Sequence, residues 1–462
     1  MFKKVLVANR GEIAVRIIRA LKEMGILSVA VYSDADRSSL HTQYADYAYS
    51  LNGDRSIDTY MNIEKIIKIA TDTGVDAIHP GYGFLSERET FARAVEEAGI
   101  TFIGPDSKVI QLMGDKIAAR KLMQSLGVPI VRGSKRAISQ SGDARKLAEK
   151  IGYPVLIKAA AGGGGMGMRV AYGPEELEQM LENVRNHAAS VFGDSSVFIE
   201  KYIERPRHIE VQILGDKYGN IVHLGERECS IQRRHQKIVE ESPSSVITPD
   251  IREKMGAAAT AIARAVNYHS AGTVEFIYDK GEFYFLEMNT RVQVEHTITE
   301  MLAGIDIIKT QIRIAAGEQL SFKQQDISFR GHALECRICA ENPLNGFIPS
   351  PGVITEYSAP GGFGLRVDSG VYSGYEVSTY YDSMLSKLIS WGNDRNEAIS
   401  RMQRALNEYV IAGPKTNIPY LWAVMGSNDF RCGNISTKFI EEHEHLFDEA
   451  RMFVKKMGRI EG

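Results

Sequence analysis

The stretch from Glu287 to His296 constrains this chain more than any other, because its polar and apolar residues alternate. In an extended strand, side chains point in turn to opposite faces. Met288, Val292 and Val294 would therefore face a core. The other face would carry only polar side chains, namely Glu287, Asn289, Arg291, Gln293 and Glu295. A solvated edge strand is one interpretation, but the apolar segments beside it favour a floor that binds a charged substrate.

Two apolar segments just before this stretch are predicted to form a hairpin around a three-residue loop at 279–281, with glycine in the left-handed position. In that register Glu275 lies opposite Phe285, and Glu275 and Glu287 share a face as diagonal neighbours. Two carboxylates and the amide oxygen of Asn289 are hard ligands that suit magnesium. A two-residue loop would place the glutamates on opposite faces, so the metal hypothesis depends on the loop.

Length and composition limit the class of protein. A chain of 462 residues is expected to form two or three domains. A net charge of −3 argues against a nucleic-acid or anionic-membrane binder, and no apolar run approaches the roughly 20 residues of a membrane helix. The first residues lead directly into a strand, which predicts no signal peptide. Four cysteines indicate a reducing compartment, so we expect a cytoplasmic protein.

Short apolar strands alternate with amphipathic helices in the first part of the chain, for example strands at 3–8, 28–32 and 77–79. This alternation predicts an α/β fold with a doubly wound parallel sheet. The dinucleotide fingerprint G-x-G-x-x-G is missing after the first strand, so a cofactor is not expected there. The glycine-rich turn from His79 to Glu87 could line a site or only shape a turn, and the sequence leaves both open.

A run of glycines at 162–165 lies between a strand that contains Lys158 and another that begins at Met168. This strand–loop–strand order differs from the strand–loop–helix order of the Walker P-loop. Backbone N–H groups of such a loop can still approach phosphates closely, and Lys158 would supply a point charge. A mobile surface loop is the alternative. The basic run at 226–237 is either solvated surface or a counter-charge for phosphates.

From His332 onward the chain is predicted to form short strands and turns, closed by a helix at 395–409. Arg337 shares a face with Glu335 in the first of these strands, so a structural salt bridge is its simplest interpretation. No second C-x-x-C accompanies Cys336 and Cys339, which are therefore interpreted as packing residues.

With these residues aligned, the chain resembles biotin carboxylase, an ATP-grasp enzyme, over nearly its whole length. The resemblance rests on the specific segments 8–14, 79–87, 157–158 with the glycine run, 233–237, 287–296 and 331–337. It implies an N-terminal doubly wound domain (1–113), an ATP-grasp core (114–330) with a mobile lid (131–203), a C-terminal β-rich domain (331–446) and a tail (447–462).

The resemblance also implies a role for each site residue. ATP would be bound by Lys116, Lys158, Gly164, Gly165, Glu200, Lys201, Tyr202, Ile203, His208, Gln232, His235, Glu275 and Glu287. Two magnesium or manganese ions would be bound by Glu275, Glu287 and Asn289. Bicarbonate and biotin would be held by Lys237, Arg291, Gln293, Val294 and Arg337. Glu295 would deprotonate bicarbonate, Arg291 would stabilise the phosphorylated intermediate, and Arg337 would stabilise a biotin enolate. Lys237 completes the catalytic set.

The implied reaction is the first half-reaction of a biotin-dependent carboxylase, in which ATP and bicarbonate form carboxyphosphate and biotin is then carboxylated. The chain contains no Ala-Met-Lys-Met biotin-acceptor motif, so we expect biotin on a separate carrier protein, with carboxyltransferase subunits as further partners. The resemblance implies a homodimer with Arg19, Glu23, Phe363 and Arg366 at its interface. The final acceptor stays open among acetyl-CoA, propionyl-CoA and pyruvate.

Two positions depart from the family pattern. Met166 stands in the glycine run where a basic residue is usual, and Thr297 stands where a proline is frequent. Met166 prompts the hypothesis of a catalytically weak, regulatory nucleotide-binding subunit. Another ATP-grasp ligase that forms a different acyl phosphate is a second alternative, against which Arg337 and the region from His332 to Lys387 argue.

Overall fold

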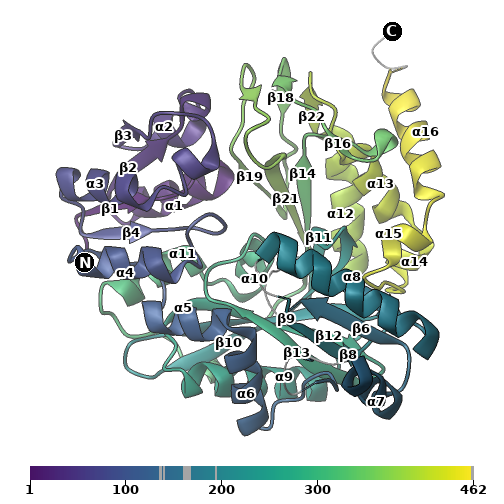
Figure 1. The fold of residues 1–462 in the computed structure, drawn as a ribbon. Helices are drawn as coiled ribbons and strands as arrows, with labels where there is room; N and C mark the ends of the chain where they lie inside the picture. Colours follow the sequence, from purple (N-terminus) through teal and green to yellow (C-terminus); the bar gives the residue numbers. More distant parts are fainter. Residues whose placement is uncertain (135–137, 139–140, 160–167, 193–194, 459–462) are drawn as a thin grey trace.

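The computed structural model of the chain is shown in Figure 1. The structure describes residues 1–134, 138, 141–159, 168–192 and 195–458. Three residues of the glycine run lie outside the described residues: Gly164 and Gly165, which are predicted to bind ATP, and Met166, which departs from the family pattern. None of the helices in these ranges is long and apolar enough to cross a membrane.

The N-terminal region is built on a five-stranded parallel sheet. Its strands are β1 (Lys4–Val7), β2 (Leu27–Tyr32), β3 (Tyr47–Ser50), β4 (Ala77–His79) and β5 (Thr101–Phe102), in the order β3-β2-β1-β4-β5. Its helices are α1 (Gly11–Glu23), α2 (Leu40–Tyr44), α3 (Ile63–Thr73), α4 (Glu89–Glu97), α5 (Ser107–Gly114) and α6 (Lys116–Ser125).

Alternation along β1 explains why both faces of this sheet are covered. Val5 and Val7 pack in a core with α1, whereas Leu6 packs in a separate core with α3 and α4. The predicted doubly wound sheet is confirmed.

A small antiparallel sheet in the order β7-β6-β8 follows. Its elements are α7 (Ser141–Ile151), β6 (Val155–Ala159), β7 (Met168–Ala171), α8 (Pro174–Phe192) and β8 (Val197–Lys201). The two helices pack on the sheet around a core of their own. Lys158 pairs with Met168 across β6 and β7, so the strands that flank the glycine run are those predicted.

An eight-stranded antiparallel sheet forms the centre of the molecule, in the order β13-β12-β9-β10-β11-β14-β21-β19. Its first five strands are β9 (Arg207–Gly215), β10 (Ile221–Arg233), β11 (Gln236–Ser242), β12 (Ser270–Asp279) and β13 (Glu282–Asn289). The helices of this segment are α9 (Pro249–Ala265), α10 (His296–Ala303) and α11 (Ile307–Ala315). The other three strands, β14 (His332–Cys339), β19 (Leu365–Ser369) and β21 (Met384–Gly392), come from the predicted C-terminal domain. One sheet therefore crosses the boundary expected at residue 331.

The C-terminal region is more helical than the prediction of short strands and one closing helix. After α12 (Arg395–Glu408) come α13 (Ile418–Gly426), α14 (Asn428–Arg431), α15 (Phe439–Glu442) and α16 (Leu446–Gly458). The short strands are β15 (Glu341–Asn342), β16 (Ile348–Pro349), β17 (Gly352–Val353), β18 (Glu356–Ser358), β20 (Glu376–Val377) and β22 (Val410–Ala412). Ala450 and Phe453 of α16 join the core formed by α12, α13, β14 and β21, so most of the predicted tail is a packed helix.

Candidate active site

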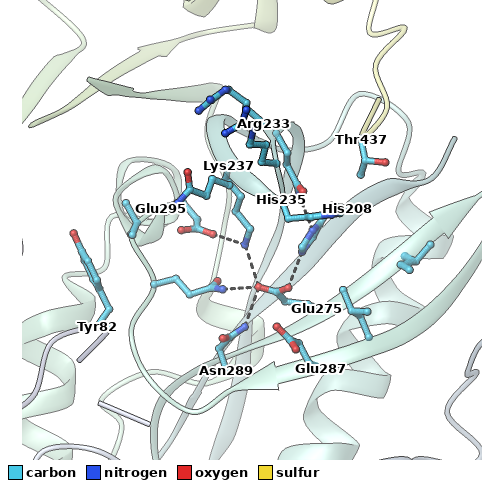
Figure 2. A pocket seen from close by; sticks show the side chains of 18 of the residues that line it. Tyr82, His208, Arg233, His235, Lys237, Glu275, Glu287, Asn289, Glu295 and Thr437 are labelled. Carbon is cyan, nitrogen blue, oxygen red and sulfur yellow. Dashed lines mark hydrogen bonds and ion pairs between the residues drawn. The ribbon is translucent and has the colours of Figure 1, made fainter. Parts of the chain in front are cut away.

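A cavity of about 1110 Å³ lies between the small sheet, one face of the central sheet and the C-terminal region (Figure 2). Its walls include Lys116 from α6, Lys158 from β6, Tyr202 after β8, Arg337 from β14 and Thr437 before α15. The cavity brings together residues more than 300 positions apart in the sequence.

The β12–β13 hairpin corrects the predicted register. Asp279 pairs with Glu282, so the loop has two residues, and Lys280 and Gly281 both adopt positive φ angles of 48° and 93°, as a tight hairpin turn requires. With that loop alone, Glu275 and Glu287 would lie on opposite faces of the hairpin. A register shift between Glu275 and Phe276 leaves one extra residue on β13, and this bulge returns the two glutamates to the same face. Glu275 and Glu287 are directly opposed, closer than the diagonal arrangement that we predicted.

The predicted extended floor is right only at its beginning. β13 ends at Asn289, and residues 290–295 form a loop and turn that lead into α10. Gln293 and Glu295 nevertheless reach the site and are buried, because the turn folds back over the central sheet. Glu295 is the residue that immediately precedes the first turn of α10. Strand alternation predicted five residues that all line the cavity, but by a partly wrong geometry.

Lys237 on β11 contacts three carboxylates of the site. Its Nζ atom donates to Glu275 Oε1 at 3.0 Å and Glu295 Oε1 at 2.7 Å (Figure 2), and also to Glu210 Oε2 at 2.6 Å. Burial would lower its pKa, but the three carboxylates raise it well above the ordinary lysine value. Burial alone would raise the pKa of Glu275 and Glu295, yet Lys237 and further cations hold both well below the usual range. The site thus contains ionised groups of both signs at neutral pH.

Arg337 contacts the second carboxylate oxygen of Glu295. Its Nη2 atom donates to Glu295 Oε2 at 3.0 Å and its Nε atom donates to Glu240 Oε1 at 2.6 Å. The alternative of a structural salt bridge with Glu335 is wrong, because Glu335 accepts a hydrogen bond from Thr297 instead. Arg337 lines the cavity, so its guanidinium faces both the candidate base and open space.

The glycine turn at 79–87 lines the site, which resolves the alternatives left open by the sequence. Asn9 Nδ2 donates to the Pro80 and Tyr82 carbonyls at 2.7 and 2.8 Å. Gly81 has a φ of +63°, and a Cβ there would lie 2.8 Å from Asn9 Nδ2, so the turn needs glycine.

The end of this turn supports Arg291, which the sequence placed among the catalytic residues. Glu87 accepts a hydrogen bond of 2.9 Å from Arg291 Nε. The Nη2 atom of the same guanidinium donates to Asn289 Oδ1, also at 2.9 Å. Burial would lower the pKa of Arg291, but Glu87 and Glu295 raise it, so the guanidinium is a fixed cation at the edge of the cavity.

The predicted nucleotide-binding residues lie at the other end of the cavity. Lys158 Nζ forms an ion pair of 2.5 Å with Glu200, which also pairs with Arg120. Burial lowers the pKa of Lys116 and nearby Lys158 lowers it further, while Glu287 opposes the change. These cations line a space next to Glu287, as contacts to phosphates would require.

The predicted contacts to ribose and adenine are also near one another. Gln232 Nε2 lies 2.9 Å from His208 Nδ1, and His208 Nε2 lies 2.8 Å from a carboxylate oxygen of Glu275. His235 lies in the β10–β11 turn and lines the cavity, as do Tyr202 and Ile203. The Lys201 N–H donates to the Arg132 carbonyl at 2.8 Å, so this donor is already engaged within the chain. The Lys201 ammonium binds the Gly152 and Tyr153 carbonyls instead.

The predicted metal ligands differ in their readiness to bind a cation. Glu287 faces the cavity (Figure 2), and within the described ranges no hydrogen bond or ion pair engages its carboxylate. Desolvation raises its pKa, and Glu275 and Glu87 raise it further. A divalent cation would relieve this concentration of negative charge, so the residues fit magnesium. Asn289 Oδ1 accepts from Arg291 at 2.9 Å, so a metal ion there would compete with the guanidinium.

Three buried residues that sequence reasoning did not single out support the site. Arg227 is fully buried and donates to Glu210 at 2.5 Å and to Gln293 Oε1 at 2.8 Å. Lys387 is also fully buried and donates to the Val294 carbonyl at 2.7 Å. Alternation could have identified Glu210, because it lies two residues after His208 in a predicted strand. No local sequence pattern identifies Arg227 or Lys387 as part of the site.

Comparisons with known proteins identify the family of the chain. Family models match residues 1–110 (biotin carboxylase, N-terminal domain), 115–323 (carbamoyl-phosphate synthase L chain, ATP binding domain) and 335–442 (biotin carboxylase C-terminal domain). A pyruvate carboxylase subunit from Methanothermobacter thermautotrophicus is 55% identical over 99% of this chain and 93% of its own length. Biotin carboxylase 1 of Bacillus subtilis is 54% identical over 96% of this chain and 99% of its own length.

Solved structures give the same result. The biotin carboxylase domain of 2-oxoglutarate carboxylase from Hydrogenobacter thermophilus, a dimer with MgADP, ADP and bicarbonate, has a TM-score of 0.93 and 54% identity over 97% of this chain and 99% of that one. A biotin carboxylase complex from Campylobacter jejuni has a TM-score of 0.92 and 47% identity over 96% of this chain and 99% of that one. This chain therefore belongs to the biotin carboxylase family of ATP-grasp enzymes.

Proposed function

We propose that two groups of side chains divide the ATP-dependent carboxylation of biotin in this chain, with Glu295 shared between them. The observation that carries the proposal is the pairing of the two Glu295 oxygens with different cations. Oε1 accepts from Lys237 and Oε2 accepts from Arg337, and the carboxylate is buried. Lys237 would take part in the activation of bicarbonate, and Arg337 would act on biotin.

In the first step, Glu295 accepts the proton of bicarbonate. Lys237 and Arg337 hold its pKa well below the usual range, so the side chain is an ionised base at neutral pH. Bicarbonate is a weak nucleophile, and a base together with a cationic clamp lowers its barrier. Arg291, Lys237, Gln293 and the Val294 backbone would form that clamp, and all of them line the cavity.

ATP would lie across the other end of the cavity with its γ-phosphate toward the clamp. Lys116, Lys158 and His208 would hold its phosphates and ribose, and the segment 200–203 would hold adenine. Magnesium, bound through Glu287 and Glu275, would neutralise charge on the transferring phosphoryl group. Attack of bicarbonate on the γ-phosphate gives carboxyphosphate and ADP.

In the second step, the C–O bond of carboxyphosphate would break to give CO₂ and phosphate. The released phosphate would take the proton of the ureido nitrogen of biotin, and that nitrogen would then bond to CO₂. The Arg337 guanidinium would stabilise the enolate of the ureido group, because it faces the cavity and stays protonated. Burial lowers its pKa, but Glu240 and Glu295 raise it well above the ordinary value.

An assay of ADP release with bicarbonate, with and without free biotin, tests this function. Bicarbonate-dependent ADP release together with carboxybiotin is the expected result. ADP release without any carboxybiotin would favour a ligase that acts on a different acid. Negligible turnover that is revived by Met166→Lys would favour the regulatory role, whereas robust turnover of the natural chain would discard it.

The partners and boundaries are part of the same proposal. A separate carrier protein and carboxyltransferase subunits are supported by the name of the relative from Methanothermobacter thermautotrophicus, which is one subunit of pyruvate carboxylase. We retain the domain limits at residues 113, 330 and 446. Four free cysteines support a cytoplasmic location.

A homodimer is supported by the dimeric structure from Hydrogenobacter thermophilus. Of the proposed interface residues, Phe363 is 77% exposed and Arg19 is exposed beside Tyr44. Glu23 pairs with Lys309 and Arg366 with Glu300 within the chain, so contacts to a second copy would extend existing ion pairs. Sedimentation at micromolar concentration should show a dimer, and a monomer alone would contradict the interface.

A further inference from the structure

A second, buried pair of residues joins the same two elements as Glu295 and Arg337. Thr297 lies in the first turn of α10, two residues after Glu295, and Glu335 lies two residues before Arg337 on β14. Thr297 Oγ1 donates a hydrogen bond to Glu335 Oε2. Side chains two apart on a strand share a face, so the two pairs connect α10 with β14 in parallel, one at the cavity and one behind it.

The two pairs differ in their surroundings. Arg337 lines the cavity, whereas Thr297 and Glu335 are fully buried and do not contribute to its walls. Within the described ranges, Glu335 Oε1 has no hydrogen-bond partner. A buried carboxylate with one partner is costly, so the neutral acid is favoured. In agreement, burial raises the pKa of Glu335 to about 8, and nearby Glu240 adds to the rise although Lys387 opposes it.

The turn that precedes α10 is also held from β21, where Lys387 Nζ donates to the Val294 carbonyl at 2.7 Å. The contact at Val294 fixes one side of Glu295 and the contact at Thr297 fixes the other. A carboxylate that must serve two cations needs such support, because errors of about 1 Å in placement can cost a hundredfold in rate.

We propose that Thr297 and Glu335 are a positioning pair that sets Glu295 against Arg337 and thereby couples ATP cleavage to biotin carboxylation. The pair acts only through Glu295 and Arg337, so the inference rests on the proposed function. Without the hydroxyl contact, the start of α10 can shift relative to β14, and the Glu295–Arg337 contact is the one that lengthens. The contact of Glu295 with Lys237 is expected to tolerate such a shift, because the ammonium sits on a flexible stem, whereas the planar guanidinium of Arg337 is also held by Glu240.

The test compares Thr297→Val, which keeps the shape and loses the hydroxyl, with Thr297→Ser, which keeps the hydroxyl. ADP and carboxybiotin are measured in the full chain with saturating ATP, bicarbonate and free biotin, and melting temperatures are compared. The expected result for Thr297→Val is about a tenfold fall in carboxybiotin formation, equivalent to about 1.4 kcal/mol. Bicarbonate-dependent ADP release should fall less than about threefold, and Thr297→Ser should match the natural chain.

A carboxybiotin-to-ADP ratio within about twofold of the natural chain in a folded Thr297→Val protein would overturn the proposal. An equal loss in the serine variant would also overturn it. If Thr297→Val does not fold, Glu335→Gln and Glu335→Met decide the question. The glutamine keeps an acceptor and should preserve the ratio, and the methionine should lower it; equal ratios in the two would reject the pair. A natural chain that forms no carboxybiotin would instead contradict the proposed function.

Discussion

The two ends of the cavity differ in how their charges are paired. At the reaction end, Lys237 contacts three carboxylates and Arg337 contacts two, all through buried or nearly buried atoms. At the nucleotide end, Lys158 has a single carboxylate partner and is 27% exposed, and Glu287 faces open space. At the reaction end, each of these cations has two or three carboxylate partners before any ligand binds. At the nucleotide end, the charged side chains have fewer partners and can still bind a ligand.

The difference suggests what each end does. Preorganised charges stabilise a transition state without reorganisation at the moment of reaction, which suits the site of proton removal and carboxyl transfer. Charges with few partners suit the reversible binding of ATP and metal ions, because fewer buried contacts are disturbed when a ligand binds. Changes at the reaction end should therefore affect the chemical steps, and changes at the nucleotide end should affect binding.

The largest effect is expected for Glu295→Gln. The amide cannot accept the bicarbonate proton, and general-base catalysis contributes about 10²–10⁴-fold. Bicarbonate-dependent ADP release and carboxybiotin formation should both fall by about a thousandfold. Parallel assays of the two products check this result, with thermal melting as the control for folding. A variant that retains even a tenth of the ADP release would remove Glu295 from the role of base.

A smaller effect is expected for Glu287→Gln at the nucleotide end. Loss of one charged ligand of a cation should lower turnover at fixed ATP by about 10- to 100-fold, from about 1.5–3 kcal/mol of lost interaction. Excess magnesium or manganese should restore part of the activity, because binding is impaired and the chemistry is intact. Titration with each metal measures this rescue. Unchanged kinetics, or a loss that no metal concentration relieves, would contradict the metal site.

A third effect concerns stability and develops gradually with pH. Because the pKa of Glu335 is about 8 in the folded chain, the folded state keeps a proton that the unfolded state loses above the usual pKa near 4.5. Its contribution to the free energy of unfolding therefore decreases from about pH 5 to pH 8 and is constant above that range.

Glu335→Gln removes this titration. Its free energy of unfolding relative to the natural chain should rise by up to about 1.4 kcal/mol per pH unit between pH 5 and 8. Denaturant unfolding at three pH values measures the difference. Parallel curves for the two proteins would show that Glu335 is ionised in the folded state.

Local patterns predicted much of the molecule, and their failures have physical causes. Alternation found the residues of the floor because Glu287 and Asn289 lie on a true strand. It could not show that the strand ends there, since a turn that folds back over a sheet can carry the same polar residues. The extra residue on β13 was also invisible, because a β-bulge depends on pairing with the partner strand.

Long-range pairing explains the other failures. β11 pairs with β14, placing Glu240 opposite Glu335, and these residues are far apart in sequence. The single sheet across the predicted domain boundary was therefore not predictable from local periodicity. Arg227 has the sequence environment of a solvated charge, and only its partners on β9 and after β13 make it a buried support. The roles of individual residues came from the resemblance to the family.

The division of Glu295 between two cations is tested most directly by Arg337→Ala. ADP and carboxybiotin are measured side by side in a protein whose melting temperature shows that it is folded. Since Lys237 contacts the other oxygen of Glu295, we expect much of the bicarbonate-dependent ADP release to persist while carboxybiotin formation is lost. A parallel loss of both products in the folded variant would contradict the separate role of Arg337 and the division of the site.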